Sequence, residues 1–208
     1  MNHIKTIGIL GGMGPRASAY FQTLFVEEMG RVGRVQDHHF PRTITLNIPL
    51  KDWDITGSLD DESVADQVKA GVDWLSEAGA EVIAIPCNTV HRFYSTFSRS
   101  DVRILDIVTE TERLEGGDRF GVLCSRSSRN SALYGDALYP ENQAAVDATI
   151  DQVVCGLSPD ISNLISDLGT KSVILGCTEL SLCTFRANMG VRVNDSSRAL
   201  ARALVNSL

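Results

Sequence analysis

Residues 81–90 read EVIAIPCNTV, and residues 172–180 read SVILGCTEL. In each stretch, a short apolar run of strand type ends at a cysteine that polar residues follow. The run IGIL at residues 7–10 is similarly matched by FGVL at residues 120–123. Because both matches occur in the same order, the sequence predicts two related halves, and in each a buried strand leads to a cysteine.

Short apolar runs alternate with amphipathic segments along the chain, which is typical of an α/β fold with parallel sheets. The patterns predict strands over 6–10, 43–48, 81–85, 102–106, 118–123, 172–175 and 191–193. They predict helices over 17–30, 61–78, 131–138, 144–154, 161–168 and 196–208. We expect a first lobe of residues 1–108 plus about 195–208, and a second lobe of residues 109–194. The linker between them is expected near 107–117, where Gly116 and Gly117 interrupt the pattern.

The composition is that of an acidic globular protein. The 208 residues include 19 Lys+Arg and 26 Asp+Glu, so the formal net charge of −7 argues against a nucleic-acid partner. No apolar run approaches the roughly 20 residues that cross a bilayer, so no membrane partner is expected. The first ten residues resemble a buried strand more than a signal peptide, so we expect a cytoplasmic protein.

The cysteines do not form a recognisable disulfide or metal pattern. Their number is odd, their spacings are wide, and no C-x-x-C pair occurs. Zinc requires about four closely placed nitrogen or sulfur ligands, and the chain has only four histidines. We therefore expect no metal site and ask which cysteines are reactive. The five are Cys87, Cys124, Cys155, Cys177 and Cys183.

Cys87 and Cys177 are expected at the carboxyl ends of parallel strands, where open α/β sheets bind ligands. Backbone N–H groups at a helix start lower the pKa of a thiol, so both positions predict thiolate character. A thiolate and a thiol on opposite faces of one carbon can remove a proton and return one from the other side. Two buried structural cysteines are the alternative interpretation, and Cys124 at a third strand end is a weaker candidate.

Four motifs in the chain resemble those of the aspartate/glutamate racemases, which are cofactor-independent amino-acid racemases. They are GILGGMGP at 8–15, IPCNTVH at 85–91, GVLCSRSS at 121–128 with Leu133-Tyr134, and VILGCTEL at 173–180. The resemblance implies two three-layer α/β lobes related by pseudo-twofold symmetry, with the active site in the cleft between them. It also implies that no pyridoxal phosphate, other cofactor or metal is used, and that the protein is a homodimer.

The resemblance further implies roles for individual residues. Cys87 and Cys177 would be the two catalytic acid/bases that invert the α-carbon of an amino acid, with aspartate or glutamate as the expected substrate. Glu179 would assist or orient the neighbouring thiol, and a solvated or helix-capping carboxylate is the alternative. The substrate-binding residues would be Met13, Gly14, Lys51, Asn88, Thr89, Ser127, Ser128 and Thr178.

The sequence departs from the family in two places. Aspartate racemases carry an Ile-Pro-Asp-Arg pattern where this chain has Leu50 and Lys51 after Ile-Pro, so an acid is missing unless Asp52 or Asp54 replaces it. A lysine expected near residues 154–156 is also missing, and Arg126 or Arg129 would have to replace it. The chain therefore supports a racemase more strongly than it supports aspartate as the substrate.

Three other interpretations remain open. Decarboxylases and isomerases that act on small dicarboxylates share this scaffold, and an amino-acid-binding homologue with impaired catalysis would keep the binding residues. The pattern G-x-G-x-x-A at residues 12–17 is also found in dinucleotide-binding proteins. However, no acidic residue ends a strand about 20 residues later, as ribose binding requires.

Overall fold

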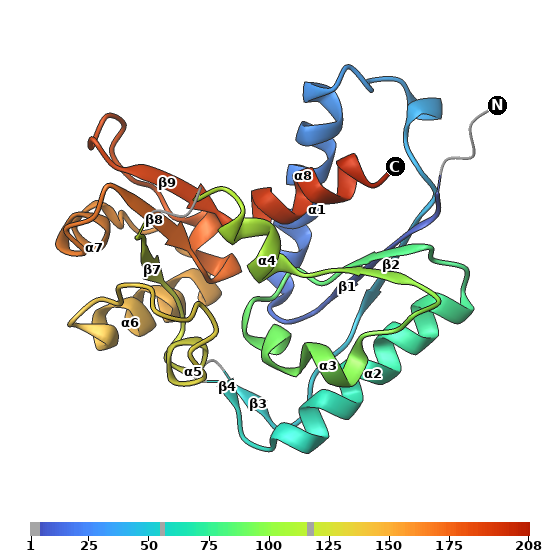
Figure 1. Cartoon of the computed structure of the whole chain (residues 1–208), viewed down its shortest axis with the longest axis horizontal. Helices are drawn as coiled ribbons and strands as arrows, with labels where there is room; N and C mark the ends of the chain where they lie inside the picture. The colour runs from blue at the N-terminus through green and yellow to red at the C-terminus, as the bar shows by residue number, and fades with distance from the viewer. Residues whose placement is uncertain (1–4, 55–56, 116–118) are drawn as a thin grey trace.

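The computed structural model describes residues 5–54, 57–115 and 119–208, and it contains two parallel sheets flanked by helices (Figure 1). The first sheet has the order β2-β1-β5-β6, and the second has the order β7-β8-β9. The sheets lie in different halves of the chain, so the fold is the predicted two-lobed α/β architecture. No helix in the described residues is long and apolar enough to cross a bilayer.

Helices cover both faces of the first sheet because its central strand alternates its buried side chains between two cores. Ile7 and Ile9 contribute to one core with residues of α1 and α8, whereas Leu10 contributes to another with residues of α2 and α3. The strands are β1 (Ile7–Gly11), β2 (Thr43–Asn47), β5 (Val82–Ala84) and β6 (Arg103–Leu105). The helices are α1 (Pro15–Arg31), α2 (Asp61–Glu77), α3 (Tyr94–Phe97) and α8 (Ser196–Asn206).

The second sheet is built in the same way. Leu123 and Leu175 belong to a core with α6 and α7, whereas Val122 and Ile174 belong to the core that contains residues of α4. The strands are β7 (Gly121–Leu123), β8 (Ser172–Leu175) and β9 (Arg192–Asp195). The helices are α4 (Ile107–Glu112), α5 (Arg126–Asn130), α6 (Gln143–Val154) and α7 (Ser162–Asp167).

The two lobes repeat one order of elements, with β7, β8 and β9 in the places of β1, β5 and β6. In each lobe an aspartate after or at the end of the last strand caps the next helix: Asp106 caps α4, and Asp195 caps α8. Strand β2 lies beside β1, whereas at the equivalent place beside β7 the described residues form a single β-bridge, between Gly121 and Leu138. The second lobe is therefore the abbreviated one.

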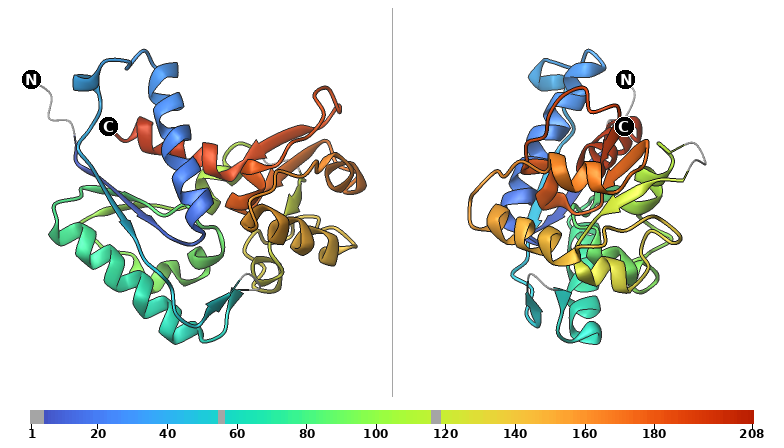
Figure 2. Two further views of the ribbon diagram at one scale, coloured as in Figure 1. Left: turned by 180° about the vertical axis from the view of Figure 1, so that it is seen from behind. Right: turned by 90° about the vertical axis from the view of Figure 1, so that its left-hand side faces the viewer.

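The lobes share a core, and α8 lies between them beside α1 and α4 (Figures 1 and 2). One cluster joins Ile9 and Leu105 of the first sheet to Val122 and Ile174 of the second and to Leu200 of α8. The first half of the expected linker is helix α4, and Gly116 and Gly117 lie outside the described residues. The division near residue 108 stays a prediction.

The helix expected over 131–138 is wrong, because the helix in this region is α5, which ends at Asn130. Ser125 caps the start of α5 by accepting the Ser128 N–H, and Ala132 and Gly135 then have φ values of 49° and 53°. That left-handed backbone cannot continue a helix. The short hairpin of β3 (Trp53–Asp54) and β4 (Gly57–Ser58) was not predicted, nor was the 3-10 turn η1 (Asp37–His39).

Candidate active site

The carboxyl ends of the two sheets meet at one pocket of about 210 Å³, which residues of both lobes line. This is smaller than the pockets of about 300–1,000 Å³ that hold drug-sized ligands, so the pocket suits a molecule of amino-acid size. Both predicted cysteines are in the lining. The lining residues are Gly12, Met13, Gly14, Pro15, Trp53, Asp54, Cys87, Asn88, Thr89, Ser125, Ile150, Val154, Cys177, Thr178 and Glu179.

Cys87 follows strand β5 and precedes the 3-10 turn η2 (Thr89–Phe93). Its side chain is buried, and the backbone N–H groups of Val90 and Thr89 donate to its sulfur atom. These donors favour the thiolate, but burial and the negative charge of Glu179 oppose it. Burial is the largest effect and raises the pKa of the Cys87 thiol to about 12.

Cys177 occupies the matching position after strand β8, at the start of the 3-10 turn η3 (Thr178–Leu182). Its thiol is buried and donates a hydrogen bond to Glu179 Oε2 at 3.1 Å. Burial raises the pKa of Cys177 well above its usual value, and the charge of Glu179 raises it further. Cys87 contributes to the same shift, so the two thiols are close enough to interact electrostatically.

The predicted thiolate character of Cys87 and Cys177 is wrong for the ligand-free protein. A helix start lowers a thiol pKa when its N–H groups outweigh the cost of removing the sulfur from water. Here each cysteine is followed by a 3-10 turn of only five residues, and burial is the larger effect at both sulfurs. Both side chains therefore rest as thiols at neutral pH.

Glu179 connects the second lobe to the loop that follows β1. Its Oε2 accepts hydrogen bonds from Cys177 and from Thr178 Oγ1 (3.3 Å), and its Oε1 accepts the Gly14 N–H at 3.3 Å. A Cβ atom at Gly14 would lie only 2.9 Å from Oε1, so a larger residue there would displace the carboxylate from this position. The carboxylate is buried against the thiol and is not a solvated surface group.

Three hydroxyl groups from the two lobes form a cluster beside the pocket. Thr89 Oγ1 lies 3.1 Å from Ser125 Oγ and 2.9 Å from Ser128 Oγ. Each hydroxyl can donate and accept, so Thr89 and Ser125, which line the pocket, can turn a proton toward a bound carboxylate. Ser128 supports the cluster from behind, whereas Ser127 is half-buried and outside the lining.

Both the nitrogen and the oxygen of the Asn88 side-chain amide form hydrogen bonds. Its Nδ2 donates to Ser196 Oγ at 2.9 Å, and its Oδ1 accepts a hydrogen bond from the buried Tyr134 hydroxyl. The Tyr134 ring also lies against Gly176, where a Cβ atom would be 2.8 Å from the ring. Tyr134 therefore contacts the loops of both cysteines, a role that the sequence analysis did not assign to it.

Besides Ser127 and Ser128, two further predicted positions lie outside the pocket lining. Lys51 is exposed and does not line the pocket; its backbone is bound by Gln67. Cys124 is fully buried in the core shared by the lobes. Met13, Gly14, Asn88, Thr89 and Thr178 are in the lining as expected, with both cysteines and Glu179.

Five lining side chains were missed as site residues: Pro15, Trp53, Ser125, Ile150 and Val154. Ile150 and Val154 are four residues apart on the predicted helix, so the sequence showed that they share a face but not that this face meets the other lobe. Ser125 was visible in the motif at 121–128. Trp53 belongs to the unpredicted hairpin, and no sequence pattern placed it here.

Comparisons with known proteins agree with this arrangement. The family model for Asp/Glu/Hydantoin racemase matches residues 10–204. The broad specificity amino-acid racemase RacX of Bacillus subtilis is 23% identical over 221 residues, and the match covers 97% of each chain.

Solved structures share the fold at low sequence identity. The aspartate racemase of Picrophilus torridus has a TM-score of 0.77 and 21% identity, with 98% of this chain and 94% of that chain covered. An aspartate racemase homologue from Pyrococcus horikoshii has a TM-score of 0.75 and 23% identity, with 98% and 99% covered. Because the family model spans both sheets and both cysteine loops, the chain belongs to the Asp/Glu/Hydantoin racemase family.

Proposed function

We propose that the protein inverts the α-carbon of an amino acid by two-base proton transfer between Cys87 and Cys177, without pyridoxal phosphate or metal. One observation carries the proposal: two buried cysteines, one after each central strand of the two lobes, line the same small pocket. The family supports amino-acid racemase activity. The Bacillus subtilis relative, named a broad specificity amino-acid racemase, favours the same substrate class.

The α-carboxylate of the substrate would bind to the hydroxyls of Thr89, Ser125 and Thr178, with the α-carbon between the two sulfurs. Glu179 would take the Cys177 proton, which leaves a thiolate that can remove the α-proton from its own face. The Cys87 thiol would then donate its proton to the opposite face and become the thiolate. The other enantiomer reacts in the reverse direction, and the positive ammonium group of the substrate favours the thiolate form.

The decisive experiment compares Cys87→Ala and Cys177→Ala in deuterated water. We expect both variants to fold and both to lose racemisation. Each should retain exchange of the α-proton for one enantiomer only, because one base still faces that proton. Cys155→Ala is the matched control, because Cys155 is exposed and outside the pocket. Normal racemisation by either active-site variant would refute the two-base assignment.

The same assay separates the other interpretations. Release of carbon dioxide from a small dicarboxylate would identify a decarboxylase, and amino-acid binding without α-deuterium would identify a binding protein. Full activity after treatment with a chelator and without added pyridoxal phosphate is expected. The homodimer and the cytoplasmic location stay predictions, and light scattering of the purified protein tests the first of them.

A further inference from the structure

Apart from the cysteines and the polar groups around them, the pocket is lined mainly by apolar side chains. Trp53 packs against the core beneath the first sheet, and Ile150 is buried in the core of the second lobe. Met13 is buried, whereas Val154 is 53% exposed at the C-terminal end of α6. A substrate side chain that enters this part of the pocket therefore contacts apolar side chains on several sides.

In the described part of the chain, no lysine, arginine or histidine lines this pocket. The charged side chains that do line it are acidic, Asp54 and Glu179. A substrate with a second carboxylate would bring a further negative charge next to Glu179. Removing such a charge from water without a lysine, arginine or histidine in the lining to pair it is costly, and the charge of Glu179 adds to that cost.

Three arginines that lie close to pocket residues in the sequence are bound elsewhere. Arg16 donates to two backbone carbonyls at the end of α6, at 2.6 and 2.7 Å. Arg126 pairs with an aspartate of α6 at 2.9 Å, and Arg129 donates to a backbone carbonyl at 2.8 Å. Lys51 is exposed and outside the lining. Neither arginine proposed from the sequence as a replacement for the missing lysine is available to a substrate.

We infer that the pocket accepts amino acids with uncharged, apolar side chains and discriminates against aspartate and glutamate. This inference rests on the proposed function, because it concerns the substrate of that same site. The pocket volume of about 210 Å³ suits whole amino acids with medium-sized side chains, such as leucine and methionine. The apolar walls of Trp53, Ile150 and Val154 favour these side chains, because contact with them removes apolar surface from water.

The first test measures α-deuterium incorporation by the wild-type protein with single enantiomers of leucine, methionine, aspartate, glutamate and lysine. We expect kcat/KM for leucine or methionine to exceed that for aspartate and glutamate by about 100-fold, because an unpaired charge is excluded. Equal or faster turnover of aspartate or glutamate would overturn the inference, and so would a preference for lysine.

The inference and the proposed function can fail separately. Absence of exchange with every amino acid would refute the proposed racemase activity. Calorimetric titration with the same five amino acids would then still decide the side-chain class. Tighter binding of leucine or methionine than of aspartate supports the inference, and tighter binding of aspartate or lysine contradicts it.

A second test supplies the absent cation. Val154→Lys places an ammonium group in the pocket wall at a half-exposed position that tolerates a long side chain. We expect the ratio of kcat/KM for glutamate to that for methionine to rise about tenfold or more. Leu157→Lys is the matched control, because Leu157 is 58% exposed near the same helix end and outside the lining. An unchanged ratio in Val154→Lys, or an equal change in both variants, would count against the inference.

Discussion

The sulfur atoms of Cys87 and Cys177 have different partners, and the difference determines where each proton rests. Two backbone N–H groups donate to the Cys87 sulfur. The Cys177 sulfur has one such donor, the Glu179 N–H, and its thiol donates to the Glu179 carboxylate. Backbone donors stabilise a thiolate, and a neighbouring carboxylate stabilises the thiol but can also accept its proton. The pocket is thus chemically asymmetric although its two halves share a topology.

At the scale of these residues, we predict that activity rises with pH. The pKa of Cys87 is raised to about 12, so the thiol predominates at neutral pH. Below about pH 12, each increase of one pH unit raises the thiolate fraction about tenfold. Since removal of the α-proton by Cys87 requires its thiolate, kcat/KM in that direction should increase between about pH 6 and pH 9. A rate profile for each enantiomer measures this, and a flat profile would contradict it.

Glu179→Gln should show whether Glu179 accepts the Cys177 proton or only raises the pKa of the two thiols. The variant removes a negative charge that raises the pKa of both Cys87 and Cys177, so both thiols should ionise at a lower pH. Turnover should nevertheless fall by about 10²–10⁴-fold, because the amide cannot take the Cys177 proton. Peptide-resolved alkylation rates against pH report the thiol acidity, and racemisation reports kcat.

Glu179→Asp is the control for this experiment, because it keeps the charge and shortens the side chain by one methylene group. Its thiols should alkylate with the pH dependence of the wild type. A role of Glu179 in folding alone would leave the alkylation profile of Glu179→Gln unchanged while the protein lost stability. That pattern would remove Glu179 from the proposed proton path.

At the scale of elements, the sequence predicted what hydrophobic patterning controls. The strands that carry Cys87 and Cys177 are buried apolar runs, and the α1, α2, α6 and α8 helices follow from amphipathic periodicity and caps such as Asp195. The helix expected over 131–138 is absent because Ala132 and Gly135 have left-handed backbone, which the spacing of apolar residues does not reveal. Tyr134 in this turn donates to Asn88 of the first lobe, so the turn is stabilised by a contact with the other lobe.

The sequence motifs predicted only part of the pocket lining. The motif positions Gly14, Thr89 and Glu179 line the pocket as expected. The pocket walls at Trp53 and Val154 could not be found, because their placement depends on how one lobe faces the other. The thiol pKa was predicted in the wrong direction for the same reason: a sequence shows nearby N–H donors but not the extent of burial.

The turn between α5 and α6 gives a prediction about Tyr134. Its hydroxyl donates to Asn88 Oδ1, and its ring supports Gly176 beside the second cysteine. Tyr134→Phe leaves a buried amide oxygen without its donor, at a cost of about 1–3 kcal/mol. We expect the unfolding free energy to fall by that amount and kcat to fall about tenfold, because the amide can then rotate.

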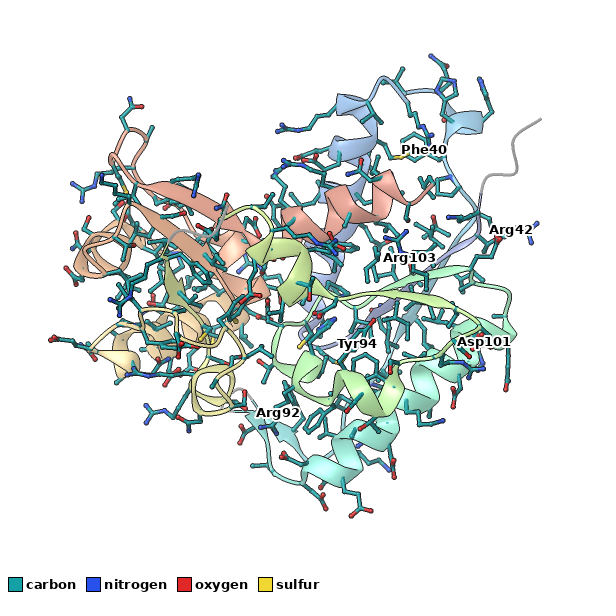
Figure 3. All side chains as sticks on the ribbon, in the orientation of Figure 1. Phe40, Arg42, Arg92, Tyr94, Asp101 and Arg103 are labelled. Atoms are coloured by element: carbon teal, nitrogen blue, oxygen red, sulfur yellow. The ribbon has the colours of Figure 1, made fainter. Side chains whose placement is uncertain are left out.

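Tyr94→Phe is the matched control for Tyr134→Phe. Tyr94, labelled in Figure 3, donates its hydroxyl to the Ile104 carbonyl at 2.9 Å, away from the pocket lining. Its loss should lower stability by a similar amount and leave kcat unchanged. Equal effects of the two variants on kcat would show that Tyr134 acts only through stability.

At the scale of the whole molecule, the pocket exists only while the lobes keep one relative orientation. The shared core, α8 and a few polar contacts hold that orientation, and the Gly14–Glu179 hydrogen bond and the Thr89–Ser125 contact lie at the pocket itself. The shared core holds the lobes at α8, and a polar contact closer to the pocket can affect substrate binding by positioning one pocket wall, without taking part in the chemistry.

Arg16 is the clearest such contact, because it extends from the start of α1 to the end of α6. It donates to the carbonyls of Val153 and Leu157, where the negative end of the helix dipole attracts a cation. Arg16→Met removes these bonds and keeps the aliphatic stem. We predict that KM rises several-fold more than kcat falls, because the α6 wall of the pocket is no longer fixed. The unfolding free energy should drop by about 1–3 kcal/mol.

Two measurements on Arg16→Met, steady-state kinetics and denaturant unfolding, distinguish an orienting role from a purely stabilising one. Arg42→Met is the control, because Arg42 is exposed at the outer edge of the first lobe, far from the pocket lining (Figure 3). A rise in KM confined to Arg16→Met supports the orienting role, since a folded but misaligned wall weakens binding of substrate. A loss of stability with KM unchanged would mean that the lobes are held by the shared core and α8 alone, with Arg16 contributing only to the end of α6.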